Sequence, residues 1–413
     1  MKPTNFFLIP FAILTLFACN DNIDDNQRFN TMPIELNLSA TEIKLTDEGQ
    51  IFGMDLFSAV SAEDKDKENI VISPLSLNIA LAMVWNGANG ETKEAIQKAM
   101  GISNYPPEEV NAYFKKLQDI LPETDPRTKL SLANSIWTRQ GFPIKESFYN
   151  INEKWYDAKV SELDFDSPKA VDIINQWCSD NTNGLIKEML KNIPSNVVMY
   201  LMNALYFKGE WSDGCAFPKS DTRDANFFPE NGQMIQVKMM SQKSEQPYYA
   251  DEHLALTSLP YGNGAYKMVF ILPNGSFDDM IERLRQPDYL SNCLKGGYTR
   301  EVNLFVPKFK IEYEIKLNEP LTQMGMEIAF SDFADFSGIS NVGLTISEVK
   351  QKTFIEVNEE GTEAAAVTSI SMEKTSVGPP QPVLFRADRP FLFLIQESSS
   401  GVILFMGKIG KPE

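Results

Sequence analysis

Few residues in this 413-residue chain could support covalent catalysis. There is one histidine, His253, so a hydrolase with a Ser-His-Asp or Cys-His arrangement would have to be built on it. No GxSxG, HExxH or Walker sequence is present. Beyond residue 19, Cys178, Cys215 and Cys293 form no CxxC pair, so we interpret them as small buried or half-buried hydrophobic residues. A hydrolase using His253 is the weakest function hypothesis, and the sequence predicts no metal and no cofactor.

Residues 359–382, EEGTEAAAVTSISMEKTSVGPPQP, combine small side chains with a proline-rich end. In an extended chain, successive side chains point to opposite faces. One face would carry no charge and would consist of Thr362, Ala364, Ala366, Thr368, Ile370 and Met372. The opposite face would carry the acids Glu363 and Glu373. Because burying an unpaired charge is costly, the first face is suited to a core, and the segment could enter a sheet as a strand. The alternative is a short helix over the alanine run, but that ignores the alternation up to Met372.

The elements that would position these residues alternate between helices and strands. Helices are predicted over 42–61, 74–86, 172–183 and 317–326. Apolar runs predict strands over 129–138, 196–207, 266–273, 300–310, 344–357, 391–396 and 401–408. Helices dominate the first half and strands the second, which predicts an α+β fold. Because no linker rich in Gly, Pro or Ser divides the chain after residue 45, we expect one large domain over 45–413.

The charge of the chain excludes some partners. A formal net charge of −18 is unsuited to nucleic acid, because affinity for phosphate comes from Lys and Arg. It does not favour an anionic membrane surface either. No clear cluster of Lys and Arg indicates activation by a heparin-like polymer.

Nine short sequences, in order and without a large gap, resemble the serpin family of serine protease inhibitors. They are NIVISPLSLNIALAMVWNGANGET, ANSIWTRQGFPIKESF, INQWCSDNTNGLI, MNALYFKGEW, VPKFKIEYEIKLNEPL, ADFSGI, IEVNEEGTEAAA, FRADRPFLFLI and ILFMGKIGKP. The resemblance implies a single domain with three β-sheets, about nine helices and an exposed reactive-centre loop, here about 359–382.

In inhibitory serpins a protease attacks this loop and forms an acyl-enzyme, after which the loop inserts into the main sheet and the protease is trapped. The resemblance therefore implies a suicide inhibitor of serine-type, and also of some cysteine, endopeptidases. It would act as a monomer on target proteases. The alternative hypothesis is a non-inhibitory binding protein whose loop is only a protease substrate.

The resemblance also assigns residues. The hinge of the loop matches Glu359, Glu360, Gly361, Thr362, Ala364, Ala365 and Ala366. The family count from Gly361 places the reactive bond at Thr375, followed by Ser376. We favour the bond Lys374–Thr375, because Lys374 suits a trypsin-like protease, with Met372 and Ser376 as alternatives.

Other matched positions would control opening of the main sheet. Ser73, Ser76 and Asn203 match the shutter, a hydrogen-bond network beneath the sheet. Gln351 stands where the family usually has a histidine. Trp211 and Glu359 match the breach, where insertion begins.

The N-terminus predicts export. An apolar run too short to span a bilayer follows Lys2, and Ala18 precedes Cys19 in a sequence that resembles a bacterial lipobox. We expect residues 1–18 to be a signal peptide and 19–44 to be an acidic tether anchored by a lipid on Cys19. The protein would then be an outer-membrane or cell-surface lipoprotein of a bacterium, in contact with the membrane only through that lipid. The alternative is a secreted protein with an ordinary signal peptide.

Overall fold

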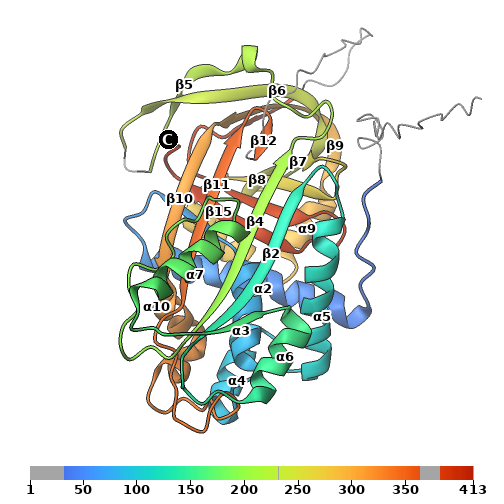
Figure 1. Cartoon of the computed structure of the whole chain (residues 1–413). Coiled ribbons are helices and arrows are strands. Elements are labelled where there is room, and N and C mark those ends of the chain that lie inside the picture. Colours follow the sequence, from blue (N-terminus) through green and yellow to red (C-terminus); the bar gives the residue numbers. More distant parts are fainter. Residues whose placement is uncertain (1–31, 231, 363–381, 413) are drawn as a thin grey trace, which may run out of the picture.

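Two β-sheets with helices packed against them form the part of the chain that the computed structural model describes, residues 32–230, 232–362 and 382–412 (Figure 1). The α-helices in these ranges are α2 (Ala40–Glu63), α3 (Pro74–Trp85), α4 (Gly90–Ala99), α5 (Pro107–Ile120), α6 (Glu146–Tyr156), α7 (Pro168–Asn181), α8 (Phe277–Leu284), α9 (Tyr289–Gly296) and α10 (Asn318–Leu321). The strands are β1 (Asn69–Ile72), β2 (Lys129–Arg139), β3 (Lys159–Leu163), β4 (Met199–Glu210), β5 (Arg223–Phe227), β6 (Ile235–Ala250), β7 (Leu254–Tyr261), β8 (Tyr266–Pro273), β9 (Tyr298–Pro307), β10 (Phe309–Lys316), β11 (Lys350–Asn358), β12 (Gly361–Thr362), β13 (Val383–Arg386), β14 (Phe391–Glu397) and β15 (Ile403–Ile409).

The larger sheet contains nine strands in the order β1-β15-β14-β8-β7-β6-β9-β13, with β5 paired to β6 outside this path. The resemblance predicted three sheets, whereas the described strands form two. The reason is the 16-residue strand β6, which pairs with β5 and β9 along most of its length and with β7 through residues 248–250. All seven residues of β14 are buried, so this sheet forms the centre of the main hydrophobic core.

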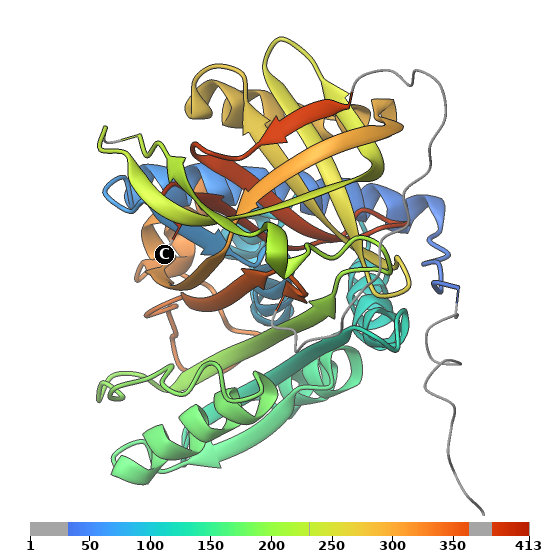
Figure 2. The same ribbon diagram turned by 90° about the horizontal axis from the view of Figure 1, so that it is seen from above.

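The six-stranded sheet has the order β10-β11-β12-β4-β2-β3. Buried and exposed residues alternate along β10, as expected for a strand with one face on the core. The inner face of the sheet packs on α3, and α7 packs on its outer face over β2 and β4. Figure 1 shows α7 in front of the sheet, and Figure 2, seen from above, shows the sheet between α7 and the rest of the molecule.

Helix α3 begins where the sequence predicts it. Ser73 is the N-cap, Pro74 occupies the first helical position, and the Ser73 hydroxyl accepts a hydrogen bond of 3.3 Å from the backbone N–H of Ser76. Of its twelve residues only Ala80 is not fully buried, which is the pattern of a helix enclosed on all sides.

Two predicted elements are shorter than expected. The strand predicted over 344–357 is regular only from Lys350 to Asn358, because β10 ends at Lys316 and leaves residues 344–349 without a partner strand. The helix predicted over 317–326 ends as an α-helix at Leu321, and the chain then turns at Gly325, whose φ of 96° is accessible to glycine.

The predicted tether is also shorter than expected. Helix α2 begins at Ala40, inside the range 19–44, with Ser39 and Glu42 forming a capping box. Before it, the N–H of Ile34 donates to the carbonyl of Thr124, and the buried Leu36 donates its N–H to the Ser399 hydroxyl. A tether would therefore end before Ile34. Cys19 lies outside the described residues.

The cysteines behave as the sequence predicts. Cys178, Cys215 and Cys293 are free thiols, and the first and last of them are buried.

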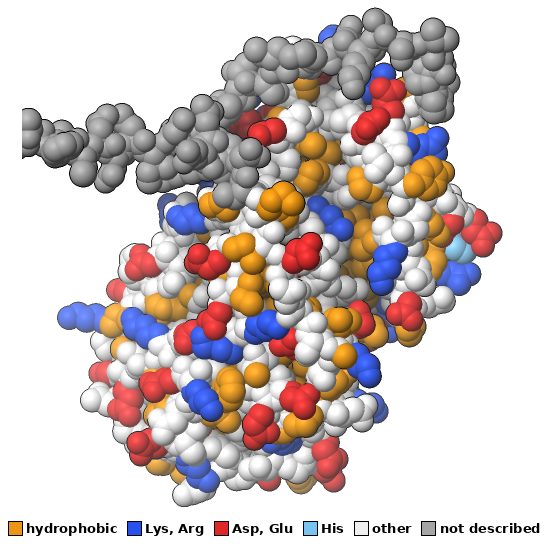
Figure 3. Space-filling view, turned by 90° about the vertical axis from the view of Figure 1, so that its right-hand side faces the viewer, with side chains coloured by type: hydrophobic (Ala, Val, Ile, Leu, Met, Phe, Trp, Pro, Cys, Tyr) orange, Lys and Arg blue, Asp and Glu red, His pale blue; other side chains and the backbone are white. Residues whose placement is uncertain are grey.

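No helix within the described ranges is long and apolar enough to cross a membrane. On the face seen in Figure 3, acidic and basic side chains are interspersed with hydrophobic ones.

Candidate functional site

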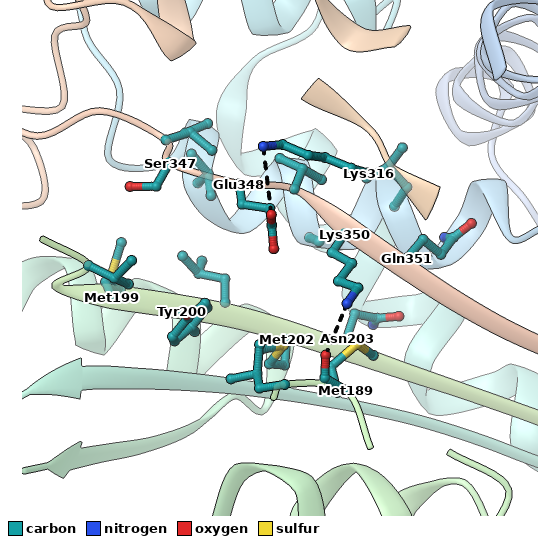
Figure 4. A pocket seen from close by; sticks show the side chains of 18 of the residues that line it. Met189, Met199, Tyr200, Met202, Asn203, Lys316, Ser347, Glu348, Lys350 and Gln351 are labelled. Carbon is teal, nitrogen blue, oxygen red and sulfur yellow. Dashed lines mark hydrogen bonds and ion pairs between the residues drawn. The ribbon is translucent and has the colours of Figure 1, made fainter. Parts of the chain in front are cut away.

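The six-stranded sheet has a vacant strand position. At its upper end the two-residue strand β12 lies between β11 and β4 and pairs with both. Below β12, no ladder among the described strands joins β11 to β4, and a cleft of about 820 Å³ separates them. Figure 4 shows residues of both strands that line this cleft, including Asn203 and Gln351. Because strand edges carry unpaired N–H and C=O groups, such a gap is suited to accept another strand.

Three other segments complete the cleft. Helix α3 forms its floor with Ser76, Leu77 and neighbouring residues, and residues 343–349 line its lower end. Residues 186–198, which connect α7 to β4, also line it. The cleft is thus enclosed by groups from both sides of the sheet.

The hinge is already seated at the upper end of the cleft. The backbone N–H of Trp211 donates to the carbonyl of Glu360 at 2.8 Å, and that of Phe217 donates to Glu359 at 2.9 Å. The indole N–H of Trp211 donates to the carbonyl of Asn358 at 3.1 Å. The predicted breach residues Trp211 and Glu359 therefore lie together, where β12 enters the sheet.

Gly361 and Thr362 fit this position for different reasons. The φ of Gly361 is 149°, and a Cβ there would lie 2.1 Å from the carbonyl oxygen of Gly209, so only glycine is accommodated. Thr362 is 2% exposed, and its hydroxyl shares a hydrogen bond of 2.7 Å with the Tyr261 hydroxyl. Thr362 therefore faces the core, as the alternation in the sequence predicts for this residue.

The two hinge acids are held by cations. The Glu359 carboxylate lies 2.9 Å from the Lys308 amine and accepts a hydrogen bond of 2.9 Å from the Thr222 hydroxyl. Burial acts to raise the pKa of Glu359, but these hydrogen bonds and the charge of Lys308 outweigh it and hold the pKa below its ordinary value. Glu360 forms an ion pair with Lys219 at 2.5 Å.

The predicted shutter residues are brought to the cleft but form two separate groups. Gln351 accepts from the backbone N–H of Ser73 and donates to its carbonyl, both at 2.9 Å. The Ser73 hydroxyl donates to the carbonyl of Leu404. Ser76 is buried beside them and contributes its backbone N–H to the N-cap. Glutamine in place of the family histidine thus keeps one half of the network.

Asn203 belongs to the other group. Its amide donates to the side-chain oxygen of Asn134 at 2.6 Å, and Asn134 donates to Gln118 and to the carbonyl of Tyr156. The side-chain oxygen of Asn203 is buried and has no hydrogen-bond partner in the described structure. A shutter that joins Asn203 to Gln351 is therefore not formed, since the cleft lies between them.

Several predicted site residues lie outside the described residues. They are the hinge residues Ala364, Ala365 and Ala366 and the reactive-bond candidates Met372, Lys374, Thr375 and Ser376. His253 is described: its ring lies 3.3 Å from the Glu252 carboxylate, and Figure 3 shows it at the surface beside acidic and basic side chains. In the described ranges no serine, threonine or cysteine side chain is hydrogen-bonded to it.

Sequence reasoning missed three residues that hold the site together. Lys308 pairs with Glu359, Tyr261 binds Thr362, and Asn134 binds Asn203. Lys308 follows directly after β9 in the sequence VPKFK, and a search for a cation to pair with the hinge acids could have found it. No sequence signal distinguishes Tyr261 or Asn134 from other strand residues.

Comparisons with known proteins show which family this chain resembles. The family model described as serpin (serine protease inhibitor) matches residues 48–412. A serpin-like protein of Thermococcus kodakarensis is 34% identical over 371 residues, which covers 88% of this chain and 84% of that protein.

Solved structures agree with the fold. The native state of tengpin, a thermophilic serpin, superposes with a TM-score of 0.82 at 34% identity and covers 94% of this chain and 98% of tengpin. Human thyroxine-binding globulin in complex with its hormone superposes with a TM-score of 0.81 at 28% identity, covering 90% of this chain and all of that one. The α+β fold predicted from the sequence is therefore confirmed.

Proposed function

The chain belongs to the serpin family of serine protease inhibitors, which are not enzymes, and we propose that it traps its target protease covalently by loop insertion. The target would be a serine-type endopeptidase of trypsin-like preference, and cysteine endopeptidases of similar specificity are a second target class. The observation that carries this proposal is the seated hinge. Residues 361–362 occupy the first positions of a strand whose remaining positions are vacant.

The register of β12 determines which residues of β11 and β4 would flank each later residue of the loop on insertion. Thr362 pairs with Val357 on β11 and Gly209 on β4, both antiparallel. Each further residue of the loop therefore moves one residue back along both strands. Six residues on, residue 368 would lie between Gln351 (357 − 6) and Asn203 (209 − 6). The uncharged set that starts with Thr362 would then face the core at every second position.

The covalent step follows ordinary protease chemistry. The protease nucleophile attacks the carbonyl carbon of Lys374, and the C–N bond to Thr375 breaks. The nitrogen of Thr375 takes up a proton and leaves as an amine, while Lys374 remains as an ester (or thioester) on the protease. Entry of residues 363–374 into the cleft would then carry the attached protease along the sheet. Strand pairing and burial make this step favourable.

A second candidate is a non-inhibitory binding protein whose loop is only cleaved. The similarity to thyroxine-binding globulin, whose solved structure contains thyroxine, favours keeping this candidate. The burial of the hinge residue Thr362 favours the inhibitor, because this position enters the sheet without an unpaired charge.

Titration with a protease separates the two candidates. Increasing amounts of trypsin are added to the protein, and the products are resolved on a denaturing gel. An inhibitor gives a band at the summed mass minus the C-terminal peptide, and its amount follows the protease added. A protein that yields only the two cleaved fragments is a substrate, and that result would overturn the proposed inhibition.

The scissile bond is found with a small panel of proteases. The released C-terminal peptide is identified by mass after reaction with a trypsin-like protease and with one that prefers large apolar side chains. Cleavage after Lys374 gives a peptide that begins at Thr375, whereas cleavage after Met372 gives one that begins at Glu373.

We also propose that the chain is exported and anchored through a lipid on Cys19. The apolar run and the Ala18–Cys19 junction support this proposal. The wild-type protein should partition into the detergent phase of a two-phase extraction, and a Cys19→Ala variant into the aqueous phase. Equal partition of the two proteins would contradict lipidation.

A further inference from the structure

One amide of helix α3 is buried without a protein partner. Apart from Ser76, Asn78 is the only residue of this twelve-residue helix with a polar side chain, and it is 5% exposed. Its side-chain oxygen is buried and has no hydrogen-bond partner in the described part of the chain. Because a buried polar atom that stays unpaired is costly, this oxygen needs a partner that the described protein groups do not supply.

Asn78 lines a small pocket between α2, α3 and α5. The volume of the pocket is about 30 Å³, and one water molecule needs about 10–15 Å³. Much of the lining is apolar, as at Leu75 and Phe114, but Thr46, Asn78 and Tyr113 bring polar side-chain atoms to it. Sites for organic ligands measure about 300 Å³ or more, so the pocket suits water and no larger ligand.

The Tyr113 hydroxyl provides a second acceptor among the lining residues. The Thr46 hydroxyl donates to the carbonyl of Glu42 at 3.0 Å and lies 2.9 Å from the Tyr113 hydroxyl. Since a hydroxyl has one proton, Tyr113 is the donor in the second of these bonds, and its oxygen keeps the capacity to accept. The side-chain oxygens of Asn78 and Tyr113 are therefore both acceptors. Two acceptors cannot bond to each other, but both can accept from one water molecule.

Gly49 leaves open space beside the same amide. It is the tenth residue of the 24-residue helix α2, where alanine would favour the helix more than glycine does. A Cβ on Gly49 would have one neighbour within 4 Å among the described residues outside its own stretch of helix, the Asn78 side-chain nitrogen at 3.8 Å. No close approach of another element therefore requires this glycine, and its effect is to keep room next to Asn78.

We propose that this pocket is a water-binding site, in which one ordered water molecule donates to the side-chain oxygens of Asn78 and Tyr113 and so links α3 to α5. A pocket of this size with two polar partners meets the requirements for a bound water. The residues that line it are distinct from those that line the cleft of the six-stranded sheet. The inference is therefore independent of the proposed inhibition.

A crystal structure of the uncleaved protein at about 1.8 Å resolution or better gives the first test. We expect a solvent peak at about 2.6–3.2 Å from both the Asn78 and the Tyr113 side-chain oxygens. The variants Tyr113→Phe and Thr46→Val both remove the hydrogen bond between residues 46 and 113, but only Tyr113→Phe removes the acceptor. The peak should be lost in Tyr113→Phe and kept in Thr46→Val. A wild-type pocket without such a peak, or with a peak bound to only one of the two oxygens, would overturn the inference.

Melting temperatures test the same site in solution, at one heating rate for all variants. Loss of the water leaves Asn78 unpaired, so Tyr113→Phe should melt about 1–4 °C below Thr46→Val. Asn78→Leu replaces the amide with an apolar side chain of similar size, and in this background the two variants should melt together. The inference is wrong if Tyr113→Phe and Thr46→Val melt together with Asn78 present. It is also wrong if their difference stays the same in the Asn78→Leu background, because Tyr113 would then act without Asn78.

Discussion

At the scale of single residues, the hinge places one small side chain where a large or charged one could not fit. Thr362 is enclosed between β11, β4 and Tyr261, and its only polar group is satisfied by the Tyr261 hydroxyl. The neighbouring residue, Glu363, belongs to the opposite face in the alternation of the sequence. This pair of adjacent positions therefore allows a test in which the same new side chain is placed inward and outward.

A Thr362→Arg variant should still be cleaved by the target protease but should form no covalent complex, because the arginine would have to be buried without a partner. A Glu363→Arg variant is the control and should retain most complex formation. Denaturing gels of both variants after protease titration give the measurement. If Thr362→Arg traps protease as well as Glu363→Arg does, the hinge does not enter the sheet in the proposed orientation.

The ion pair between Glu359 and Lys308 should contribute stability that depends on pH. The folded-state pKa of Glu359 lies below its ordinary value of 4.5, so its contribution is present above pH 4.5 and is lost as the pH falls through the folded-state pKa. A Glu359→Gln variant should therefore melt about 2–4 °C below wild type at pH 7. The difference should close as the pH is lowered below 4. A difference that stays constant between pH 7 and pH 3.5 would contradict this role.

At the scale of secondary-structure elements, the sequence predicted most of what depends on local patterns. The strands β8 and β14, the Ser73–Pro74 start of α3 and the helices α2 and α7 follow from periodicity and capping. The predictions that were wrong also have physical reasons. Residues 344–349 have the composition of a strand, but β10 ends before it could pair with them. The predicted tether includes residues 34–38, but Leu36 and Leu38 pack on the fold.

The candidate site could be predicted only in part, because its contacts join residues far apart in the chain. The hinge acids and the glycine were evident from their sequence, whereas Tyr261 and Asn134 have ordinary strand surroundings. The separation of Asn203 from Gln351 could not be foreseen either, since it depends on the width of the cleft and not on the identity of either residue.

The register of the vacant position makes a prediction for Thr368. If residue 368 lies between Gln351 and Asn203, its hydroxyl can donate to the buried, unpaired side-chain oxygen of Asn203. A Thr368→Val variant would leave that oxygen unpaired after insertion, at a cost of about 1–3 kcal/mol. The cleaved form of this variant should melt about 1–4 °C below cleaved wild type, while the uncleaved forms melt together.

The conservative variant Thr368→Ser serves as the control in this comparison, because it keeps the hydroxyl. It should restore most of the lost stability of the cleaved form. Equal melting temperatures of all three cleaved proteins would show that the loop inserts in another register or does not insert.

At the scale of the whole molecule, the vacant strand position means that the uncleaved protein has not made all the contacts available to its sequence. Insertion would bury Ile370 and Met372 and satisfy the facing edges of β4 and β11. Together these terms contribute about 10 kcal/mol or more. At about 1.2 °C per kcal/mol for a chain of this size, the cleaved protein should melt at least about 12 °C above the uncleaved protein.

Differential scanning calorimetry of the two forms checks this prediction. The cleaved form is prepared with a protease that cuts within residues 372–376 and is then purified away from it. Because unfolding of the uncleaved protein is expected to be irreversible, both scans are made at the same heating rate. Two forms that melt within a few degrees of each other would mean that cleavage does not complete the sheet.

The length of the vacant position has a consequence for which proteases can be trapped. Lys374 follows Thr362 by twelve residues, so an inserted arm that ends there reaches about 40 Å along the sheet, opposite Val197 (209 − 12), two residues before β4 begins. A protease that cuts after Met372 leaves an arm about 7 Å shorter and would come to rest before the lower end of the cleft. Two proteases that bind the loop equally well would then differ in fate, one being retained and one released, according to the peptide bond that each hydrolyses.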